Sequence, residues 1–211
     1  EDALAAVGTS PQAPCNANQS AMKFEPLNHS YGVTQFYHGA VMPDGRSFIG
    51  GAQDNGTLLG SVGAPDAWLH VLGGDGAYVA VDPTDPRYVY AQTQYGTVYR
   101  STNGGMSYSP ARNGLSDDFL FITPLQIDPN APTRLWIGGR RMWRSEARGS
   151  NWRLASLLLP GQVSAIAVSP GNSNHVLAGT NEGSIVRSDS ATTANGNSAW
   201  NVVRPRDGWV S

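Results

Sequence analysis

The stretch Ala80-Val81-Asp82-Pro83 decides the fold, because near copies of it recur along the chain. The prolines that end the copies lie 40, 46 and 41 residues apart. A period of this size marks a chain that is built from stacked structural repeats. The other three copies are Ala40-Val41-Met42-Pro43, Gln126-Ile127-Asp128-Pro129 and Ala167-Val168-Ser169-Pro170.

A second pair of residues recurs in phase with these prolines. Arg100-Ser101, Arg144-Ser145 and Arg187-Ser188 follow at offsets of 17, 15 and 17 residues. Leu59-Gly60 takes the same place in the first copy, at an offset of 16. Two landmarks that keep phase over four copies indicate a true repeat, and we expect the recurring arginines to play one repeated structural role.

Each repeat is expected to form four short strands. In the last repeat these are Val163–Val168, His175–Gly179, Ser184–Arg187 and Trp200–Val203, separated by turn residues. Four strands in a period of 40–46 residues are typical of one blade of a β-propeller. The predicted fold is therefore all-β, with about four blades of four antiparallel strands, as part of a ring of six to eight blades.

The same landmarks set the predicted boundaries. Residues 1–22 are expected to be a flexible N-terminal segment, and 23–33 the last strand of a preceding blade. Residues 207–211 are expected to start a next blade, because Trp209-Val210-Ser211 matches Gln162-Val163-Ser164. The chain would then be part of a longer protein. The predicted blades are residues 34–76, 77–115, 116–160 and 161–206.

The turn after each Arg-Ser pair has its own pattern. Ser101-Thr102-Asn103-Gly104-Gly105-Met106-Ser107-Tyr108 fits Ser-x-Asp-x-Gly-x-x-Trp, with Asn for Asp and Tyr for Trp. Residues 145–152 keep Ser, Gly and Trp but lack the acid, and the last copy contains an insertion before Trp200. This turn resembles the Asp-box, or BNR repeat, which the resemblance implies is a structural device remote from the active face.

The resemblance covers roughly residues 24–211. The repeats resemble the propellers of sortilin-like receptors, of xyloglucan-degrading glycoside hydrolases and of secreted bacterial BNR-repeat proteins described as glycosyl hydrolases. The stretches 50–57 and 74–83 are most similar to the bacterial group. One fold can host many activities, so the resemblance implies the architecture more firmly than the function.

Composition excludes several classes of protein. A net charge of −2 and a pI near 6.1 argue against a nucleic-acid binder. No apolar run approaches 18 residues, so no membrane span is expected. A single cysteine, Cys15, rules out a cysteine-rich zinc site, and no two of the four histidines have metal-ligand spacing. We expect no metal and no cofactor.

Candidate site residues follow from propeller geometry, because binding groups gather on the face where loops surround the central channel. The loops on that face join the second strand of a blade to its third, and one blade to the next. The candidate binding residues there are Gln53, Asp54, Asn55, Asp75, Gln94 and Arg140.

Asp54 and Asp75 are also the candidates for catalysis. Glycoside hydrolysis needs two carboxyl groups about 5–10 Å apart, and these two lie on adjacent loops of the predicted face. Asp-Asn-Gly and Gly-Asp-Gly are equally typical of ordinary turns. Residues 90–100 resemble a xyloglucanase segment, in which Gln94 takes the place of the catalytic acid. An amide cannot ionise, so the resemblance puts that catalytic role in doubt.

Three functions stay open. The first is a secreted or periplasmic module that binds a polysaccharide or a protein and has no catalytic activity of its own. Its further partners would be the remaining blades or a second copy of the chain. The alternative is a glycoside hydrolase of the xyloglucanase-like type. A third reading, assembly of a photosystem, would need an arginine patch, for which Arg140, Arg141, Arg144 and Arg148 are the candidates.

Overall fold

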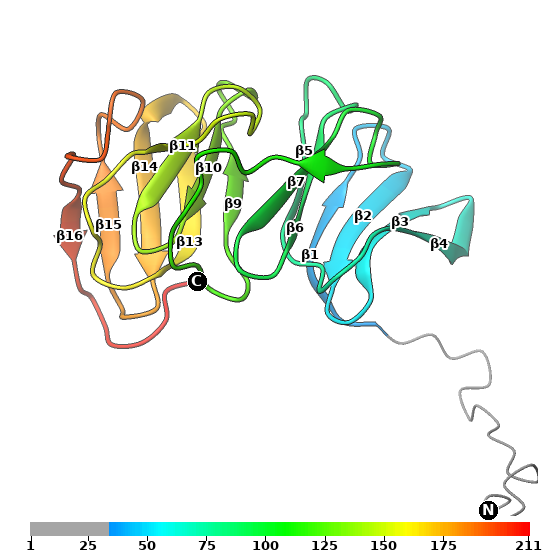
Figure 1. The fold of residues 1–211 in the computed structure, drawn as a ribbon, viewed down its shortest axis with the longest axis horizontal. Coiled ribbons are helices and arrows are strands. Elements are labelled where there is room, and N and C mark those ends of the chain that lie inside the picture. Colours follow the sequence, from blue (N-terminus) through cyan, green and yellow to red (C-terminus); the bar gives the residue numbers. More distant parts are fainter. Residues whose placement is uncertain (1–33) are drawn as a thin grey trace, which may run out of the picture. The chain divides into compact units, whose positions relative to one another are not determined.

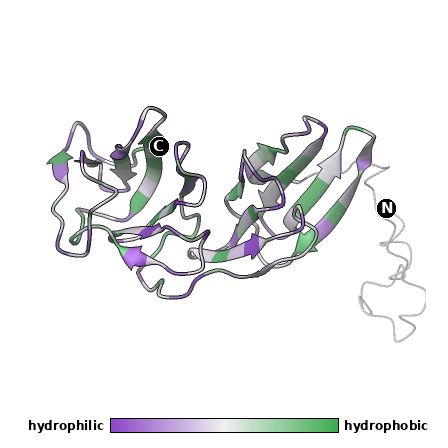
Figure 2. Ribbon diagram, turned by 90° about the horizontal axis from the view of Figure 1, so that it is seen from above, coloured by the Kyte–Doolittle hydropathy of each residue, from purple (hydrophilic) through white to green (hydrophobic). Residues whose placement is uncertain are grey.

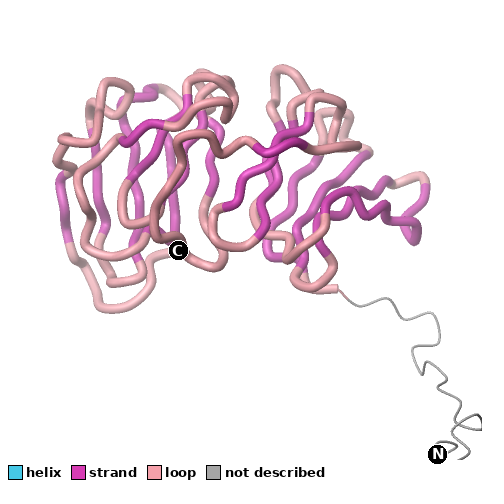
Figure 3. Tube along the Cα trace, viewed as in Figure 1, coloured by secondary structure: helices cyan, strands magenta, loops and turns pink. Residues whose placement is uncertain are grey.

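The computed structural model describes residues 34–211, which form one compact unit, Thr34–Ser211. The predictions for residues 1–22, for 23–33 and for Cys15 lie outside the described residues. Within the described range all regular structure is β-strand (Figure 3).

Sixteen strands form four sheets, which we number in chain order (Figure 1). Sheet 1 contains β1 (Phe36–Val41), β2 (Ser47–Ala52), β3 (Gly56–Ser61) and β4 (Ala64–Leu72). Sheet 2 contains β5 (Val79–Val81), β6 (Val89–Thr93), β7 (Thr97–Ser101) and β8 (Ser109–Pro110). Sheet 3 contains β9 (Leu125–Ile127), β10 (Leu135–Gly138), β11 (Met142–Ser145) and β12 (Arg153–Leu154). Sheet 4 contains β13 (Val163–Ser169), β14 (Asn172–Thr180), β15 (Ile185–Ser188) and β16 (Asn201–Val203).

Each sheet is an antiparallel meander in chain order, as expected for a propeller blade. The first strands of successive sheets contact one another, β1 with β5, β5 with β9 and β9 with β13. Hydrophobic residues lie mainly on the strands and hydrophilic ones on the loops (Figure 2). Within the described range, sheet 4 does not pack on sheet 1, so the series is not closed. The predicted all-β fold with four four-stranded antiparallel blades is confirmed.

The strand limits differ in detail from the sequence prediction. The second strand of sheet 4 begins at Asn172 rather than His175 and pairs back to Ser169 across a tight turn at Pro170-Gly171. Proline and glycine suit such a turn, so the strands continue up to it. The outer strands β8 and β12 have only two residues each.

One register position recurs in all four sheets. A residue of the second strand faces a residue of the third strand in the pairs Ile49–Leu59, Tyr90–Arg100, Trp136–Arg144 and Leu177–Arg187. Ile49, Tyr90 and Trp136 are buried in the three clusters that lie between successive sheets. This position therefore carries the apolar contact from each of the first three sheets to the next.

The arginine of the pair reaches the next sheet. Arg100 donates to the carbonyl oxygen of Arg148 and to Ser150 Oγ, both at 2.8 Å, in the turn that follows β11. Arg144 donates to the carbonyl oxygens of Ala191 and Ala194 after β15. The predicted structural role is thus seen in Arg100 and Arg144. Arg187 instead pairs with Asp189 of its own sheet.

The turn after β7 is held by the buried hydroxyl of Ser101. Its Oγ accepts hydrogen bonds from the backbone N–H groups of Asn103 at 3.1 Å and Gly105 at 2.9 Å, and it donates to Asn103 Oδ1. Asn103 Oδ1 also accepts from the Ser107 amide. Asn therefore supplies the acceptor that an Asp would supply here, because the bond needs an oxygen and not a charge. Ser145 repeats the serine part of the arrangement by accepting from Gly149 N–H at 3.0 Å.

The aromatic residue that ends the turn packs between sheets. The indole Nε1 of Trp152 donates to the carbonyl oxygen of Ala111 at 2.8 Å, and that of Trp200 to Ala155 at 2.9 Å. Each bond runs from one sheet to the segment that follows the preceding sheet. A buried tryptophan needs such a partner for its N–H, so these bonds fix how neighbouring sheets meet.

An ion pair adds to the contact between sheets 2 and 3. Arg148 pairs with the buried carboxylate of Asp82, and its guanidinium lies over the ring of Tyr88, 3.8 Å from the centroid. Burial raises the pKa of Asp82, but hydrogen bonds from Thr84, Arg148 and the Asp85 amide outweigh it and hold the pKa below its ordinary value. The charged form of Asp82 is therefore favoured in the folded protein.

Removal of the Ser101 hydroxyl tests the turn. In Ser101→Ala the amides of Asn103 and Gly105 lose their acceptor, and an unpaired buried group costs about 1–3 kcal/mol. We expect a lower midpoint of urea unfolding with the m-value unchanged. The control is Ser109→Ala on the exposed strand β8, which should change the free energy of unfolding by less than about 0.5 kcal/mol. Equal effects of the two substitutions would contradict the assigned role.

The Asp82–Arg148 pair predicts a pH dependence. A carboxylate whose pKa is lowered by folding stabilises the protein above its unfolded pKa of about 3.9, and this contribution is lost as the pH falls below that value. Asp82→Asn should therefore be less stable than the wild type at pH 6, and the difference should shrink toward pH 3. Urea unfolding at several pH values measures this, with Asp66→Asn on exposed β4 as control. A difference independent of pH would contradict it.

Candidate functional site

The predicted site residues lie in the loops at one end of the sheets. Gln53, Asp54 and Asn55 form the turn between β2 and β3, and Gln94 lies in the equivalent turn between β6 and β7. Asp75 lies in the connection from β4 to β5. This connection is held beside the first turn, because Gly76 N–H donates to the carbonyl oxygen of Ala52 at 3.0 Å.

Asp54, Asp75 and Gln94 are joined by hydrogen bonds. The backbone N–H of Asp54 donates to Asp75 Oδ1 at 3.0 Å. The backbone N–H of Asp75 donates in turn to Gln94 Oε1 at 3.3 Å. Three residues from sheets 1 and 2 thus form one continuous network. One oxygen of the Asp75 carboxylate is engaged by the protein itself, and Gln94 acts as an acceptor.

Gln53 and Asn55 are exposed, and the side chains of both form hydrogen bonds. The hydroxyl of Tyr37 donates to Gln53 Oε1. Asn55 Nδ2 donates to Thr34 Oγ1 at 3.2 Å and to the carbonyl oxygen of Gln53 at 3.0 Å. Together with Asp54 and Asp75, these side chains place amide and carboxylate groups side by side at the surface.

Two turn residues of this face have a left-handed backbone. Asp54 has a φ of 60° and Tyr95 a φ of 56°, which is uncommon for residues other than glycine. Each sits in the turn between the second and third strands of its sheet. Such conformations persist only where surrounding structure holds them, and they gather at functional sites.

Tyr95 carries an exposed ring at the tip of its turn. The side chain is 60% exposed, and its ring meets the ring of Phe121 edge to face at a centroid distance of 5.4 Å. The Tyr95 N–H donates to the carbonyl oxygen of Phe121 at 3.1 Å, so backbone and side chain are both held. Tyr95 follows the predicted site residue Gln94 directly and was not among the predicted site residues. The dipeptide Tyr95-Gly96 in a two-strand turn was the available signal.

Arg140 lies in the corresponding turn of sheet 3. It is in the turn between β10 and β11, where its carbonyl oxygen accepts from Leu159 N–H at 2.9 Å. In the described part of the chain, no hydrogen bond joins it to Asp54, Asp75 or Gln94. Its neighbour Arg141 is held through its backbone N–H by Asp117 Oδ2, which also accepts from Trp143 Nε1.

The arginines considered as a patch are largely engaged in other contacts. Arg144 binds carbonyl oxygens of sheet 4 and pairs with Glu146 at 2.7 Å. Arg148 pairs with Asp82 of sheet 2. Both guanidinium groups therefore serve contacts between sheets, which leaves Arg140 and Arg141.

The chemistry available at this face is that of hydrogen bonding and stacking. Asp75 and Asp54 supply carboxylates, Gln53, Asn55 and Gln94 supply amides, and Tyr95 supplies an exposed ring. Over residues 34–211, no group of three or more His, Cys, Asp or Glu side chains is placed to hold a metal ion. The same residues include no helix long and apolar enough to cross a membrane.

Comparison with solved structures finds the same fold in larger enzymes. An ancestral GH74 enzyme superposes with a TM-score of 0.58 at 18% identity, covering 79% of this chain and 23% of that one. The GH74 xyloglucanase from Xanthomonas campestris superposes with a TM-score of 0.59 at 19% identity, covering 84% of this chain and 31% of that one. The chain thus spans less than a third of the length of either enzyme.

No protein-family model and no curated protein matches the sequence. At these sequence identities, the similarity to the solved structures concerns the fold alone. The four sheets of this protein are therefore similar to part of the β-propeller architecture of GH74 enzymes.

Proposed function

We propose that this protein is a carbohydrate-binding β-propeller module whose ligand lies over the turns between β2 and β3 and between β6 and β7. The observation that carries the proposal is the exposed ring of Tyr95, held in a left-handed turn and packed against Phe121. A flat apolar ring of this kind offers a stacking surface for the apolar face of a sugar, and its fixed backbone lowers the entropic cost of binding.

Hydrogen-bonding groups lie in the same turn as that ring and in the neighbouring loops. Gln94 precedes Tyr95 directly, and its Oε1 joins it to Asp75. Asp75 in turn joins Asp54, and the amides of Gln53 and Asn55 lie in the same turn as Asp54. Sugar hydroxyls both donate and accept, so neighbouring amide and carboxylate groups suit them. Ligand sites typically combine an apolar surface with a few fixed polar groups in this way.

Two features of these groups favour binding over catalysis. Gln94 stands where the xyloglucanase resemblance expects the acid, and an amide can neither donate nor take up the proton that hydrolysis requires. One oxygen of the Asp75 carboxylate accepts a hydrogen bond from the Asp54 backbone N–H, so it is already engaged by the protein. These two features favour binding over hydrolysis.

A glycoside hydrolase remains the second candidate. It is favoured by the GH74 neighbours and by the position of two carboxylates, Asp54 and Asp75, on adjacent loops of one end of the sheets. In that case Asp75 or Asp54 would act as one of the two carboxyl groups.

We also propose a repeat type for the turns and a cellular location for the protein. The hydrogen bonds of Ser101 and Asn103 support assignment of the turns after β7 and β11 to the Asp-box, or BNR, type. Together with the GH74-like fold, they support an extracytoplasmic protein, secreted or periplasmic, that meets polysaccharide outside the cell. The predicted blade limits, with 207–211 as the start of a next blade, are part of this proposal.

Replacement of Tyr95 tests the binding site. Tyr95→Asn removes the ring, while asparagine tolerates the left-handed backbone. With xyloglucan as the probe in isothermal titration calorimetry, we expect binding by the wild type and a loss of roughly tenfold or more in affinity in the variant. Met106→Ala is the matched control, because Met106 is 55% exposed but lies in the turn at the opposite end of β7. Unchanged affinity in Tyr95→Asn, or no binding by the wild type, would overturn the proposal.

Measurement of hydrolysis separates the two candidates. The wild type is expected to release no reducing sugar from xyloglucan, and Asp75→Asn is expected to bind it with at most a few-fold change, because the amide oxygen can still accept from Asp54 N–H. Hydrolysis by the wild type that disappears in Asp75→Asn and Asp54→Asn, with the thermal unfolding midpoint retained, would establish the enzyme instead.

A further inference from the structure

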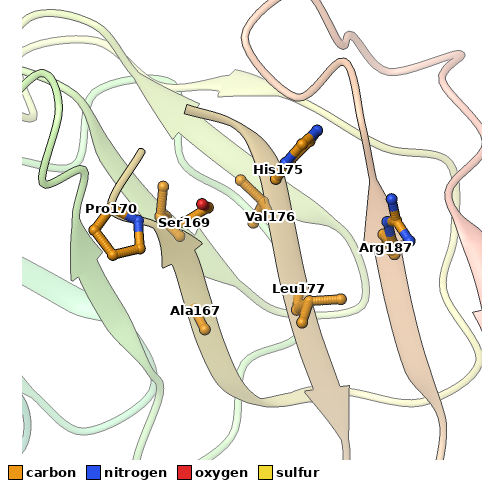
Figure 4. A pocket seen from close by; sticks show the side chains of 8 residues that line it. Ala167, Ser169, Pro170, His175, Val176, Leu177 and Arg187 are labelled. Carbon is orange, nitrogen blue, oxygen red and sulfur yellow. The ribbon is translucent and has the colours of Figure 1, made fainter. Parts of the chain in front are cut away.

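The recurring arginines of sheets 3 and 4 each pair with a carboxylate of their own sheet. In sheet 3, Arg144 Nε lies 2.7 Å from Glu146 Oε1. In sheet 4, Arg187 donates from Nε to Asp189 Oδ1 at 2.8 Å. Figure 4 shows this arginine on β15, beside Leu177 of β14. In both sheets the Nε side of the guanidinium is thus occupied by an acid.

Arg100 of sheet 2 has no such partner. Its hydrogen bonds run from Nη1 alone, to the carbonyl oxygen of Arg148 and to Ser150 Oγ. None of the ion pairs within residues 34–211 includes Arg100. In the described part of the chain, the N–H groups of its Nε and Nη2 therefore have no protein acceptor.

The sequence explains this difference between the sheets. The acid lies two residues after the arginine in Arg144-Ser145-Glu146 and in Arg187-Ser188-Asp189, but the matching stretch of sheet 2 is Arg100-Ser101-Thr102. Sheet 1 has Leu59-Gly60-Ser61 at this place and lacks both the arginine and the acid. Sheet 2 alone keeps the arginine while a threonine stands in the place of the acid.

Arg100 and Thr102 line a groove between sheets 2 and 3, each of which contacts a described sheet on both sides. The groove has a volume of about 310 Å³, and Thr133, Arg148 and Ser150 also line it. Sites for small organic ligands occupy about 300–1,000 Å³, so the groove is large enough for one. The three hydroxyl residues are exposed and can form hydrogen bonds to such a ligand.

The other charged groups that line this groove are paired within the protein. Glu146 lies 2.8 Å from Arg134 Nε and 2.7 Å from Arg144 Nε, so two arginines compensate its charge. Arg148 is paired with the buried carboxylate of Asp82. The charge that remains without a partner is that of the sheet 2 guanidinium, and the groove therefore favours an anion.

We propose that this groove is a second ligand site, which binds the carboxylate of a small organic acid against Arg100. The ligand would take the place that Glu146 and Asp189 take beside their own arginines, and the flat guanidinium suits the two oxygens of a carboxylate. The Thr102 hydroxyl would donate to the same group. The site lies at the opposite end of β7 from Tyr95, so it does not rest on the proposed function.

The test follows the arginine Nε–Hε signals of the 211-residue chain by nitrogen-15 NMR. Arg100→Lys identifies the Arg100 signal, because lysine has no such group. The probes are acetate, which presents a carboxylate alone, and D-galacturonate, which adds a sugar ring. We expect both to shift the Arg100 signal with dissociation constants in the millimolar range, and sodium chloride at the same ionic strength to leave it in place. Tighter binding of galacturonate would identify acidic sugars as the ligand, and tighter binding of acetate a smaller acid.

Thr102→Glu restores the acid that sheets 3 and 4 carry. Its carboxylate is expected to occupy the Nε side of Arg100, so the affinity for both probes should fall by roughly tenfold or more. The control is Arg153→Gln, which removes a positive charge from an exposed position of β12 that does not line this groove. It should change the affinity by less than about twofold, because salt screens exposed charges.

Four results would count against the site. They are an Arg100 signal that neither carboxylate shifts, an equal shift with sodium chloride, a Thr102→Glu variant that binds as well as the wild type, and an equally large loss in Arg153→Gln. Thr102 is exposed, and thermal unfolding shows whether the variant is folded. If it is not, Thr102→Asp takes its place, since sheet 4 carries Asp189 at the matching position.

Discussion

Each sheet of this protein has two faces to bury, and it can bury them only against the sheets before and after it. The structure meets this constraint by repeating one contact. An apolar residue of the second strand, such as Tyr90 or Trp136, enters the gap between sheets, and the opposing Arg100 or Arg144 crosses it. The arginine ends on backbone carbonyl groups, so each contact combines burial of apolar surface with a charge-assisted hydrogen bond.

The receiving turn has to be rigid for this contact to work. The turn after β11 is closed by the buried Ser145, whose hydroxyl accepts from Gly149 N–H, and it is tied to sheet 2 by Arg148 and Asp82. It can therefore present the Arg148 carbonyl to Arg100 at a fixed place. Residues 145–152 lack an acid at the position that Asn103 takes in the turn after β7, and the Asp82–Arg148 ion pair across the sheets supplies part of the restraint instead.

The fold could be predicted from the sequence because its determinants are local and repeated. The recurring motifs that include Asp82-Pro83 and Arg100-Ser101 mark where strands end. Their period of 40–46 residues is the length that four short strands and their turns occupy. The limits of β14 were harder to predict, because the pairing of Asn172 with Ser169 depends on the geometry of the turn between them. The two-residue strands β8 and β12 likewise depend on where the chain leaves the sheet, which no composition signal marks.

The candidate site could be predicted only in part from the sequence. Propeller topology was enough to place Asp54, Asp75 and Gln94 on one face, and the hydrogen bonds join them. The same reasoning put Arg140 on this face, in the equivalent turn between β10 and β11, and its place in the site stays a prediction. The proposed role of Tyr95 had only the Tyr95-Gly96 turn as a sequence signal, because it depends on a backbone angle and on a contact with Phe121 in the segment between β8 and β9.

The succession of contacts β1 with β5, β5 with β9 and β9 with β13 also determines how the molecule comes apart and together. Interactions that join only neighbours along the chain make stability a sum over adjacent units, as in a one-dimensional array. Among the four described sheets, sheets 1 and 4 each contact a single other sheet, so they are held by fewer interactions than sheets 2 and 3. During synthesis from the N-terminus, each of sheets 2, 3 and 4 can pack on the sheet that precedes it as soon as it emerges.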